Sequence, residues 1–269
     1  MTSNQTAIIG AGVMGETLLS GLVRAGRRVD NLLVGEKRAD RAAELVERYG
    51  VAVVSNVEAA TKADTVALVV KPQDMGDLLD EIAPVLRPGQ LLVSIAAGIT
   101  TAFIESRVPE GVAVVRVMPN TPALVDEGMT AISPGSHCDD AHLAEAEGLM
   151  ASVGKVLRIP ERQQDAVTAI SGSGPAYIFF VVESMIEAGV HLGLPRATAT
   201  DLVVQTVVGS AKMLRETGTH PVVLREQVTS PAGTTAAALR ELEIHKVRAA
   251  FLAAMEAARD RSRELAEGS

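Results

Sequence analysis

The sequence predicts an α/β protein, with a doubly wound sheet in its N-terminal part and an all-α domain after it. Two observations carry this prediction. Short apolar runs alternate with helix-like segments up to about residue 160, and strand-like runs nearly vanish after Glu161. Alternating strands and helices form parallel βαβ units, and right-handed crossovers place helices on both faces of one sheet. The change of pattern predicts two domains, 1–162 and 163–269.

The expected strands are short runs of β-branched or aliphatic residues. They cover residues 6–9, 32–34, 51–54, 65–70, 91–95 and 112–117, with a last strand at 156–159 that Pro160 ends. Helix-like segments at 40–49 and 73–86 lie between the strands. Asp139 or Asp140 can cap a further helix that runs to Ser152, because a short acidic side chain accepts from the free amides at a helix start.

The C-terminal domain is predicted as helices over 175–191, 196–217 and 234–266, and the last of these is rich in good helix formers. Gly193-Leu194-Pro195 and His220-Pro221 interrupt the series. A few apolar helices bury little surface when left alone. We therefore expect this domain to serve dimerisation by packing against a second copy of the chain, with a compact monomer as the alternative.

Composition and charge exclude several classes of function. Hydrophobic residues make up 47% of the 269 residues, aromatic residues only 2%, and the net charge is -8. A nucleic-acid-binding protein needs a basic surface and, for single strands, aromatic stacking platforms. The aliphatic content is ample for a buried core, which excludes disorder. We therefore expect no nucleic-acid partner.

The sequence offers no targeting or metal signal. The N-terminus lacks a basic region followed by a long apolar stretch, and the longest apolar run, 176–182, stops at Glu183. A bilayer span needs about 20 such residues. Cys138 is the single cysteine, no cluster has metal-ligand spacing, and no G-x-S-x-G sequence occurs. We expect a cytoplasmic protein without metal and without membrane contact.

A glycine-rich turn follows the first strand and opens a helix. Gly10-Ala11-Gly12-Val13-Met14-Gly15 fits G-x-G-x-x-G. Gly10 permits the tight turn, Gly12 lets the backbone approach a pyrophosphate, and Gly15 lets helix and strand pack closely. The free amides of the helix N-terminus then face the anion. The segment predicts a Rossmann-type dinucleotide site, of which Val13 and Met14 form part.

The end of the second strand carries conflicting signals about the cofactor. Glu36 lies 21 residues beyond Gly15, near the spacing of an acid that binds the ribose 2′-hydroxyl of NAD. Lys37 and Arg38 follow at once, and basic residues there hold the 2′-phosphate of NADP. A solvated loop in which one of the three touches the cofactor is the alternative. We favour NADPH, with NADH as the second choice.

Two further strand ends are candidates for the cofactor site, because ligands of open α/β sheets bind beyond the carboxyl ends of the strands. Val70, Lys71 and Pro72 lie at the end of the fourth strand, and Ala96-Ala97-Gly98 follow the fifth. The alternatives are a surface lysine with a proline helix start, and small residues that serve tight packing.

Two small-residue motifs open helices in the C-terminal domain. They are Ser171-Gly172-Ser173-Gly174-Pro175-Ala176-Tyr177 and Thr229-Ser230-Pro231-Ala232-Gly233-Thr234-Thr235. Their hydroxyls and exposed amides are suited to hold a carboxylate. Each motif taken singly is better explained as a device that starts a helix than as a site. Two of them opposite a dinucleotide fold favour a substrate site.

At these residues the chain resembles the pyrroline-5-carboxylate reductases, over nearly its whole length. The segments that carry the resemblance are GAGVMG at 10–15, VVKP at 69–72, SIAAG at 94–98, RVMPNTPALV at 116–125, SGSGPAY at 171–177, GSAKML at 209–214 and SPAGTT at 230–235. One departure is visible, since the last motif more often has two glycines and Ala232 replaces the first. Alanine fits there if φ is negative, so we expect little effect.

The resemblance implies NAD(P)H-dependent reduction of (S)-1-pyrroline-5-carboxylate to L-proline, the last step of proline biosynthesis. It implies a Rossmann domain and a helical domain that interlocks with its twin, with the active site between one subunit's Rossmann domain and the helical dimer. Many members assemble further as five dimers.

The resemblance also implies site residues. The amides of Gly233, Thr234 and Thr235 hold the substrate carboxylate, and we hypothesise that the Thr235 hydroxyl hydrogen-bonds the ring nitrogen. Further positions follow in the same way, with Ser171, Ser173 and Glu161 near the substrate and Asn56 near the adenosine. A solvated carboxylate at Glu161 and a helix cap at Asn56 are the alternatives.

Two other functions remain as alternatives. A Rossmann dehydrogenase acting on a β-hydroxy acid needs a basic catalytic residue, for which Lys212 in GSAKML is the candidate. A non-catalytic sensor that binds NAD(P)H is the second. Reduction of a cyclic imine needs no pair of acid and base residues, because the imine is basic enough to arrive as the electrophilic iminium. The histidines fit this reading, since all five lie outside the glycine-rich motifs.

Overall fold

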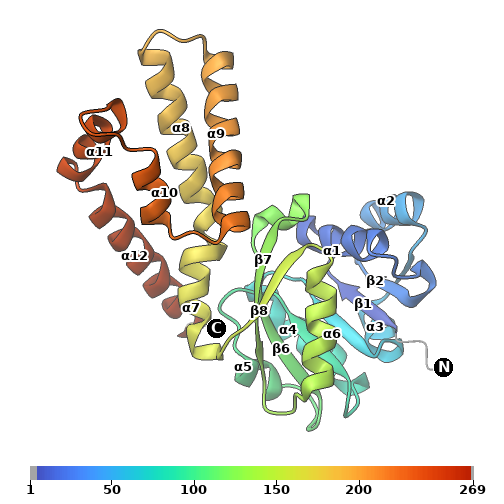
Figure 1. Ribbon diagram of the computed structural model, residues 1–269. Helices are drawn as coiled ribbons and strands as arrows, with labels where there is room; N and C mark the ends of the chain where they lie inside the picture. The colour runs from blue at the N-terminus through green and yellow to red at the C-terminus, as the bar shows by residue number, and fades with distance from the viewer. Residues whose placement is uncertain (1–4, 268–269) are drawn as a thin grey trace. The chain divides into compact units, whose positions relative to one another are not determined.

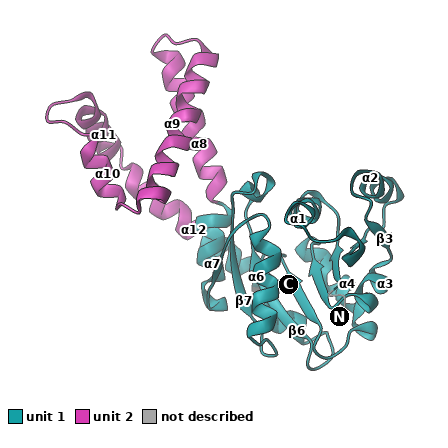
Figure 2. Ribbon diagram, turned by 45° about the vertical axis from the view of Figure 1, so that its right-hand side comes forward, with its two compact units in different colours: residues 1–173, 258–269 teal, residues 174–257 magenta. Residues whose placement is uncertain are grey.

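The computed structural model describes residues 5–267, which form two compact units (Figures 1 and 2). One unit holds residues 1–173 and 258–269, and the other holds 174–257. The first contains the whole sheet, and the second is entirely helical. The predicted class, a doubly wound α/β sheet followed by helices, is confirmed.

The sheet has eight strands in the order β3-β2-β1-β4-β5-β6-β7-β8. The strands are β1 (Thr6–Ile9), β2 (Leu32–Gly35), β3 (Ala52–Val54), β4 (Thr65–Leu68), β5 (Leu91–Ser94), β6 (Ala113–Met118), β7 (Gly128–Pro134) and β8 (Gly154–Arg158). All neighbours pair in parallel except β6 and β7, which are antiparallel. Strand β7 was missed, because its sequence GMTAISP begins with glycine and ends with proline.

Helices cover both faces of the sheet. In this unit they are α1 (Val13–Arg24), α2 (Ala39–Tyr49), α3 (Asn56–Lys62), α4 (Met75–Ile82), α5 (Thr101–Glu105), α6 (Asp140–Ala151) and α7 (Gln164–Val167). Short 3₁₀ turns lie at Val29–Asn31, Pro72–Asp74, Ala83–Val85, Thr121–Val125 and Glu161–Gln163, and a π turn lies at Thr168–Gly172. Asp139 caps α6 with a capping box, as one of the two predicted alternatives.

Alternation along the strands builds a core on each side of the sheet. Ile8 of β1 packs in one cluster with residues of α1 and α6, whereas its neighbours Ala7 and Ile9 pack in the other with α3 and α4. Successive side chains of a strand point to opposite faces, so β1 is buried on both. The carboxyl end of β1 therefore lies between the ends of β2 and β4, and the turn to α1 begins there.

The second unit consists of α8 (Gly174–His191), α9 (Arg196–Thr217), α10 (Pro221–Gln227), α11 (Thr234–Ile244) and most of α12 (Val247–Glu267), whose last turns belong to the first unit. The predicted ends of α8 and α9 agree within one residue. The prediction of one helix over 234–266 was wrong, because Lys246 adopts φ +56 between α11 and α12. The short helix α10 was not predicted.

The helical run Glu161–His191 changes one expectation. It is 31 residues long and apolar enough to cross a bilayer by length and composition, although no such stretch was expected from the sequence. One such helix is weak evidence for a membrane. Its apolar side chains, among them Phe179 at 66% and Phe180 at 69% exposure, lie uncovered in the single chain. An uncovered apolar face of this size is typical of a protein–protein interface.

Candidate active site

The glycine-rich turn between β1 and α1 has the geometry of a phosphate cradle. Gly10 adopts φ +97, and a Cβ there would lie 2.4 Å from the Val69 carbonyl oxygen. A Cβ on Gly15 would lie 2.1 Å from the Gly10 carbonyl oxygen, whereas one on Gly12 would meet nothing within 4 Å. Gly12 is the N-cap of α1 and no side chain caps it. The first amides of α1 therefore remain for an anion such as a pyrophosphate.

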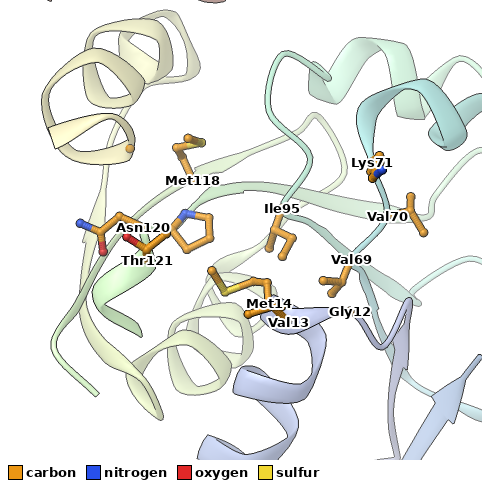
Figure 3. A pocket seen from close by; sticks show the side chains of 12 residues that line it. Gly12, Val13, Met14, Val69, Val70, Lys71, Ile95, Met118, Asn120 and Thr121 are labelled. Atoms are coloured by element: carbon orange, nitrogen blue, oxygen red, sulfur yellow. The ribbon is translucent and has the colours of Figure 1, made fainter. Parts of the chain in front are cut away.

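A cavity of about 360 Å³ opens beside this cradle, at the carboxyl ends of β1, β4, β5 and β6 (Figure 3). It is lined by Gly12, Val13, Met14, Val69, Val70, Lys71, Ile95, Met118, Pro119, Asn120, Thr121 and Gly172. A mostly apolar cavity with a few polar groups suits a flat ring such as nicotinamide. The structure thus brings together the predicted residues of the glycine turn and of the end of β4.

The part of this cavity formed by Met118 to Thr121 was missed as a site. Met118 is the last residue of β6 and the other three follow it, and their position at a strand end was the signal that would have found them. Asn120 donates through Nδ2 to the carbonyl oxygen of Ser171 (3.2 Å) and to its hydroxyl (3.3 Å), and it accepts from the Met129 amide at 2.8 Å. The Ser171 hydroxyl therefore has a partner within its own unit.

The π turn at Thr168–Gly172 brings Gly172 to the cavity wall. The Ser173 amide donates to the Thr168 carbonyl oxygen at 2.8 Å, which is the five-residue spacing of a π turn. A Cβ on Gly172 would lie 2.5 Å from Cε of Met118, so only glycine fits against this side chain without a shift. Such turns are frequent at functional sites.

A second cavity, of about 310 Å³, lies on the other side of the glycine turn. Its walls are formed by Ile9, Gly10, Gly35, Glu36, Lys37, Asn56, Val70, Asp74, Asp77 and Leu78. Glu36 is 10% exposed and accepts from the backbone amides of Ala11 (3.3 Å) and Arg38 (2.9 Å). The acid at the end of β2 is therefore held beside the glycine turn, where a Rossmann acid meets the ribose.

The basic residues after Glu36 are engaged by carboxylates. Lys37 donates to Glu81 at 2.9 Å, and Arg38 donates through Nε to Glu36 at 3.4 Å. Asn56 also donates to Glu81, at 3.2 Å. The hydrogen bond from Lys37, aided by Asn56, holds the pKa of Glu81 below its ordinary value. Ser55, not Asn56, caps α3, and Asn56 lines the cavity with its side-chain amide bonded to Glu81.

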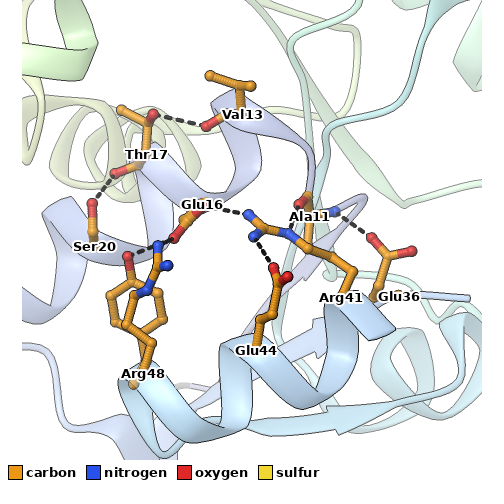
Figure 4. Close-up of polar contacts among 10 residues, drawn as sticks. Ala11, Val13, Glu16, Thr17, Ser20, Glu36, Arg41, Glu44 and Arg48 are labelled. Atoms are coloured by element: carbon orange, nitrogen blue, oxygen red, sulfur yellow. Dashed lines mark hydrogen bonds and ion pairs between the residues drawn. The ribbon is translucent and has the colours of Figure 1, made fainter. Parts of the chain in front are cut away.

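An ion-pair cluster ties α2 to the glycine turn (Figure 4). Arg41 donates through Nε to the Ala11 carbonyl oxygen (3.0 Å) and pairs with Glu44 at 2.8 Å and with Glu16. Tyr49 donates to Glu16 at 2.9 Å. Burial opposes ionisation of Glu16, but hydrogen bonds from Arg41 and Tyr49 outweigh it, so the pKa of this carboxyl lies below its ordinary value. The cluster was not predicted.

The predicted residues after β5 lie differently. Ile95 lines the first cavity, while Ala96, Ala97 and Gly98 are not among the described residues that line either cavity. Gly98 adopts φ +78. Pro72 begins the 3₁₀ turn before α4, as in the helix-start alternative. The segment that follows β5 therefore reaches the first cavity through its first residue, Ile95.

Glu161, predicted near the substrate, is engaged within its own unit. Its carboxylate accepts from the amide of Thr101 (2.8 Å), from the Thr101 hydroxyl (2.6 Å) and from Nη1 of Arg116 (3.3 Å). The Arg116 side chain is 7% exposed and that of Glu161 is 27% exposed. The two charges form a largely buried pair between β6 and the helical run that starts at residue 161.

The motif in the second unit forms an uncapped helix start. Gly233 is the N-cap of α11 without a side-chain cap, and its own amide donates to the Ser230 carbonyl oxygen at 3.0 Å. The first amide bonded to the turn of α11 is that of Ala237, which donates to the Gly233 carbonyl oxygen. The amides of Thr234 and Thr235 therefore lack an intrahelical acceptor, and Thr235 is half-buried.

The expectation about Ala232 was wrong. Its φ is +58, in the left-handed region that favours glycine, so this alanine is strained. Lys212, the candidate base for a β-hydroxy-acid reaction, is 61% exposed and pairs with Glu216 at 3.7 Å. An exposed, paired lysine on α9 has none of the burial that tunes a catalytic base.

The sheet order, the glycine cradle and the two cavities define an NAD(P)-dependent oxidoreductase of the Rossmann class. Residues 5–98 match a family model described as NADP oxidoreductase, coenzyme F420-dependent, and residues 161–265 match one described as pyrroline-5-carboxylate reductase dimerisation. The chain belongs to the pyrroline-5-carboxylate reductase family.

Relatives over the full length support this assignment. A pyrroline-5-carboxylate reductase from Corynebacterium melassecola is 48% identical over 263 residues, covering 96% of this chain and 97% of the relative. One from Pseudomonas aeruginosa is 41% identical over 269 residues, covering 99% and 98%. A 3-hydroxyisobutyrate dehydrogenase from Mycobacterium tuberculosis, at 18% identity and TM-score 0.52, shares the fold alone.

Solved structures agree over the whole chain. A pyrroline-5-carboxylate reductase from Coxiella burnetii has a TM-score of 0.94 and 37% identity, covering 98% of this chain and 99% of that one. The Plasmodium falciparum enzyme with NADP bound has a TM-score of 0.88 and 32% identity, covering 99% of both. The Rossmann and helical parts are therefore both shared with enzymes of known structure.

Proposed function

We propose that the protein reduces (S)-1-pyrroline-5-carboxylate to L-proline with NAD(P)H, as the last step of proline biosynthesis. The observation that carries this proposal is the pairing of two uncapped helix starts in one chain. That of α1 suits a pyrophosphate, and that of α11 suits a small carboxylate. Relatives named for this activity over the full length support it.

In this proposal the α11 start binds the substrate carboxylate. The amides of Thr234 and Thr235 are the donors without helical acceptors, while the engaged Gly233 amide shapes the turn. A Cβ on Gly233 would lie 2.3 Å from Oγ of Ser230, so a side chain there would force the Ser230 hydroxyl to shift. The Thr235 hydroxyl, one residue into the helix, accepts from the ring N–H of the iminium and orients it.

Bound NAD(P)H supplies the hydride, and the chain supplies position. The iminium is already electrophilic, so the residues need to orient the ring rather than move a proton in the same step. Holding two reactants in a near-attack geometry accounts for about 7–11 kcal/mol of a barrier. Carboxylate binding at α11 contributes the remote binding energy that holds the ring in this geometry. Ser171, Ser173 and Glu161 stay as predictions for the substrate side.

The remaining features of the proposal concern cofactor and assembly. We propose NADPH as the first cofactor, with NADH also accepted, because Lys37 lines the second cavity next to Glu36 and Arg38 follows it in the sequence. The proposed domain division by sequence is 1–162 and 163–269, and the dimerisation family model over 161–265 supports it. The uncovered apolar helices and the dimerisation family model support a homodimer. Assembly of five such dimers is proposed as a further step. A cytoplasmic protein without nucleic-acid or membrane partners fits the net charge of -8.

One assay tests the function. Oxidation of NADPH and NADH is followed at 340 nm with and without pyrroline-5-carboxylate, and substrate-dependent oxidation with either cofactor is the expected result. Absence of it with both cofactors overturns the proposal. Oxidised cofactor with a β-hydroxy acid, tested in parallel, reports on the dehydrogenase alternative.

A hydroxyl deletion tests the role of Thr235. We expect Thr235→Ala to lower kcat/KM about 10–100-fold, since a hydrogen bond to a charged group contributes roughly 1.5–3 kcal/mol. Thr235→Ser retains the hydroxyl and should recover most of the activity. Thr61→Ala is the matched control, because this exposed hydroxyl on α3 donates to the Val57 carbonyl oxygen and touches neither cavity. Unchanged kcat/KM in Thr235→Ala refutes the role.

A further inference from the structure

The loop 95–100 between β5 and α5 borders the first cavity at one end and is anchored at the other. Its first residue, Ile95, lines the cavity beside the glycine turn. Its last residue, Thr100, caps α5 through its hydroxyl, which accepts from the Phe103 amide at 3.1 Å. Gly98 in the middle has φ +78, a conformation that other residues adopt only with strain. The loop ends at Thr100, so a contact that fixes the next residue, Thr101, also fixes the end of the loop.

Glu161 is the group that holds Thr101. Both of its carboxylate oxygens are engaged there, one by the Thr101 amide and the other by the Thr101 hydroxyl. The carboxylate sits at the start of α5, where unpaired amides favour an anion. The link joins residues 60 apart in sequence, so it is a tertiary anchor and not a local turn.

Arg116 ties the same carboxylate to the sheet. Its Nη1 lies 3.3 Å from Oε1 of Glu161, and its backbone pairs in register with Ser94 at the end of β5. Because the guanidinium is 7% exposed, removing its carboxylate partner leaves an uncompensated buried charge. Glu161 thus connects the end of the loop with the strand that neighbours its beginning.

The last turns of α12 lie against the middle of the same loop. A Cβ on Gly98 would meet the backbone of Leu265 and Ala266 at 3.5 Å. Ser262 is buried, and its hydroxyl donates to Asp165 at 2.8 Å. Asp165 follows Glu161 by one helical turn. The segment that begins at Glu161 therefore supports the loop twice, once directly and once through α12.

We infer that Glu161 is a positioning residue for the loop 95–100 and, through it, for the nicotinamide side of the cofactor cleft. The inference rests on the proposed function and deepens it. Direct contact of Glu161 with the substrate is the alternative role, and the experiment separates the two. The adenosine side, formed by Glu36, Asn56 and Asp77, shares no residue with this anchor.

The inference predicts that loss of Glu161 weakens binding of the nicotinamide half of the cofactor and leaves binding of the adenosine half unchanged. In Glu161→Ala the loop is released at Thr101, so the Kd of NADPH and NADH should rise about tenfold. The Kd of ADP, which occupies only the adenosine side, should stay within twofold. Glu161→Gln keeps an acceptor for the Thr101 amide and loses the charge next to Arg116, so its Kd should lie between those of the wild type and Glu161→Ala.

The experiment uses the full-length protein and three measurements. Cofactor fluorescence gives the Kd of NADPH and NADH, competition gives the Kd of ADP, and initial rates give the KM of pyrroline-5-carboxylate. Glu147→Gln is the control, since it removes a more exposed carboxylate–arginine pair, to Arg158 at 2.6 Å, on residues that line neither cavity. This control should leave all three values unchanged.

Two results overturn the inference. One is a rise in the KM of pyrroline-5-carboxylate with unchanged cofactor Kd, which is the signature of substrate contact. The other is an equal loss of ADP and NADPH binding, which is the signature of general destabilisation. If Glu161→Ala does not fold, Thr101→Val decides, since it deletes only the hydroxyl bond and should raise the cofactor Kd about threefold. The titrations need no turnover, so a failure of the proposed reaction is seen separately.

Discussion

Gly12 offers a clean separation of folding from cofactor binding. Its backbone has φ -67 and ψ -167, which any residue adopts, and a Cβ there would meet no atom within 4 Å. Gly15, three residues on, is the opposite case, because its Cβ would lie 2.1 Å from a backbone oxygen. We therefore expect Gly12→Ala to leave the fold intact and to act only on the cofactor.

The magnitudes follow from this geometry. The free energy of unfolding of Gly12→Ala should stay within about 0.5 kcal/mol of the wild type, as for a surface substitution. A methyl group placed against a close-fitting pyrophosphate costs roughly 1–3 kcal/mol, as overpacking does elsewhere. The Kd of NADPH should therefore rise about 5–150-fold. Gly15→Ala should lower the free energy of unfolding by roughly 1–3 kcal/mol, because the backbone must shift.

Urea denaturation and cofactor fluorescence measure these two quantities. Gly148→Ala is the control, because Gly148 lies exposed in α6 and a Cβ there also meets nothing within 4 Å. This control should stabilise by roughly 0.5–1 kcal/mol through helix propensity and leave cofactor binding unchanged. If Gly12→Ala binds NADPH as tightly as the wild type, the assignment of the glycine turn to the pyrophosphate is refuted. A lowered urea midpoint for Gly12→Ala would show that a methyl group at residue 12 disturbs the fold, and would refute the claim that the space around it is open.

Three further predictions concern strain, cofactor choice and pH. Ala232→Gly should raise the free energy of unfolding by about 0.5–1 kcal/mol, because relief of the left-handed alanine exceeds the added chain entropy; the same change at Ala238 in α11 should lower it, and a lower urea midpoint for Ala232→Gly would contradict this. Glu36→Ser should raise the ratio of kcat/KM for NADPH over NADH about tenfold, because a carboxylate repels a 2′-phosphate; an unchanged ratio would show that Glu36 does not face the ribose. Glu16→Gln should destabilise by about 1–2 kcal/mol at pH 7 through the lost charged hydrogen bonds. The lowered pKa of Glu16 means that this difference is present above the unfolded pKa of about 4.3 and disappears as pH falls through the folded pKa. Urea unfolding of both proteins at pH 7 and pH 3 measures it, and a difference that persists at pH 3 would assign it to packing.

Much of the first unit was predictable from sequence because its signals are local. Runs of β-branched residues located seven of the eight strands to within about two residues, and G-x-G-x-x-G located the phosphate cradle. The requirement for glycine at positions 10 and 15 comes from a turn and a close approach between neighbouring elements. Such requirements act over a few residues, so they are visible in the sequence.

The site was predictable only where it follows a strand end already recognised. Lys71 and Val70, predicted for the cofactor site, line the first cavity because they continue β4. Met118 to Thr121 lie at the end of β6 in the same way, but they were not predicted as site residues. Gly172 reaches this cavity from a helical run more than fifty residues later, through a π turn that no local pattern indicates.

The sequence by itself determined the alternation of strands and helices, the glycine cradle and the family resemblance, since periodicity and turn chemistry are set by neighbouring residues. The tertiary structure alone decided the antiparallel β7, the engaged carboxylate of Glu161 and the left-handed φ of Ala232. Strand partners and hydrogen-bond partners lie tens of residues apart, and their choice depends on the packing of the whole unit. A local pattern carries no record of that packing, which is why the hydrogen bonds between Glu161 and Thr101 could not be predicted from the sequence.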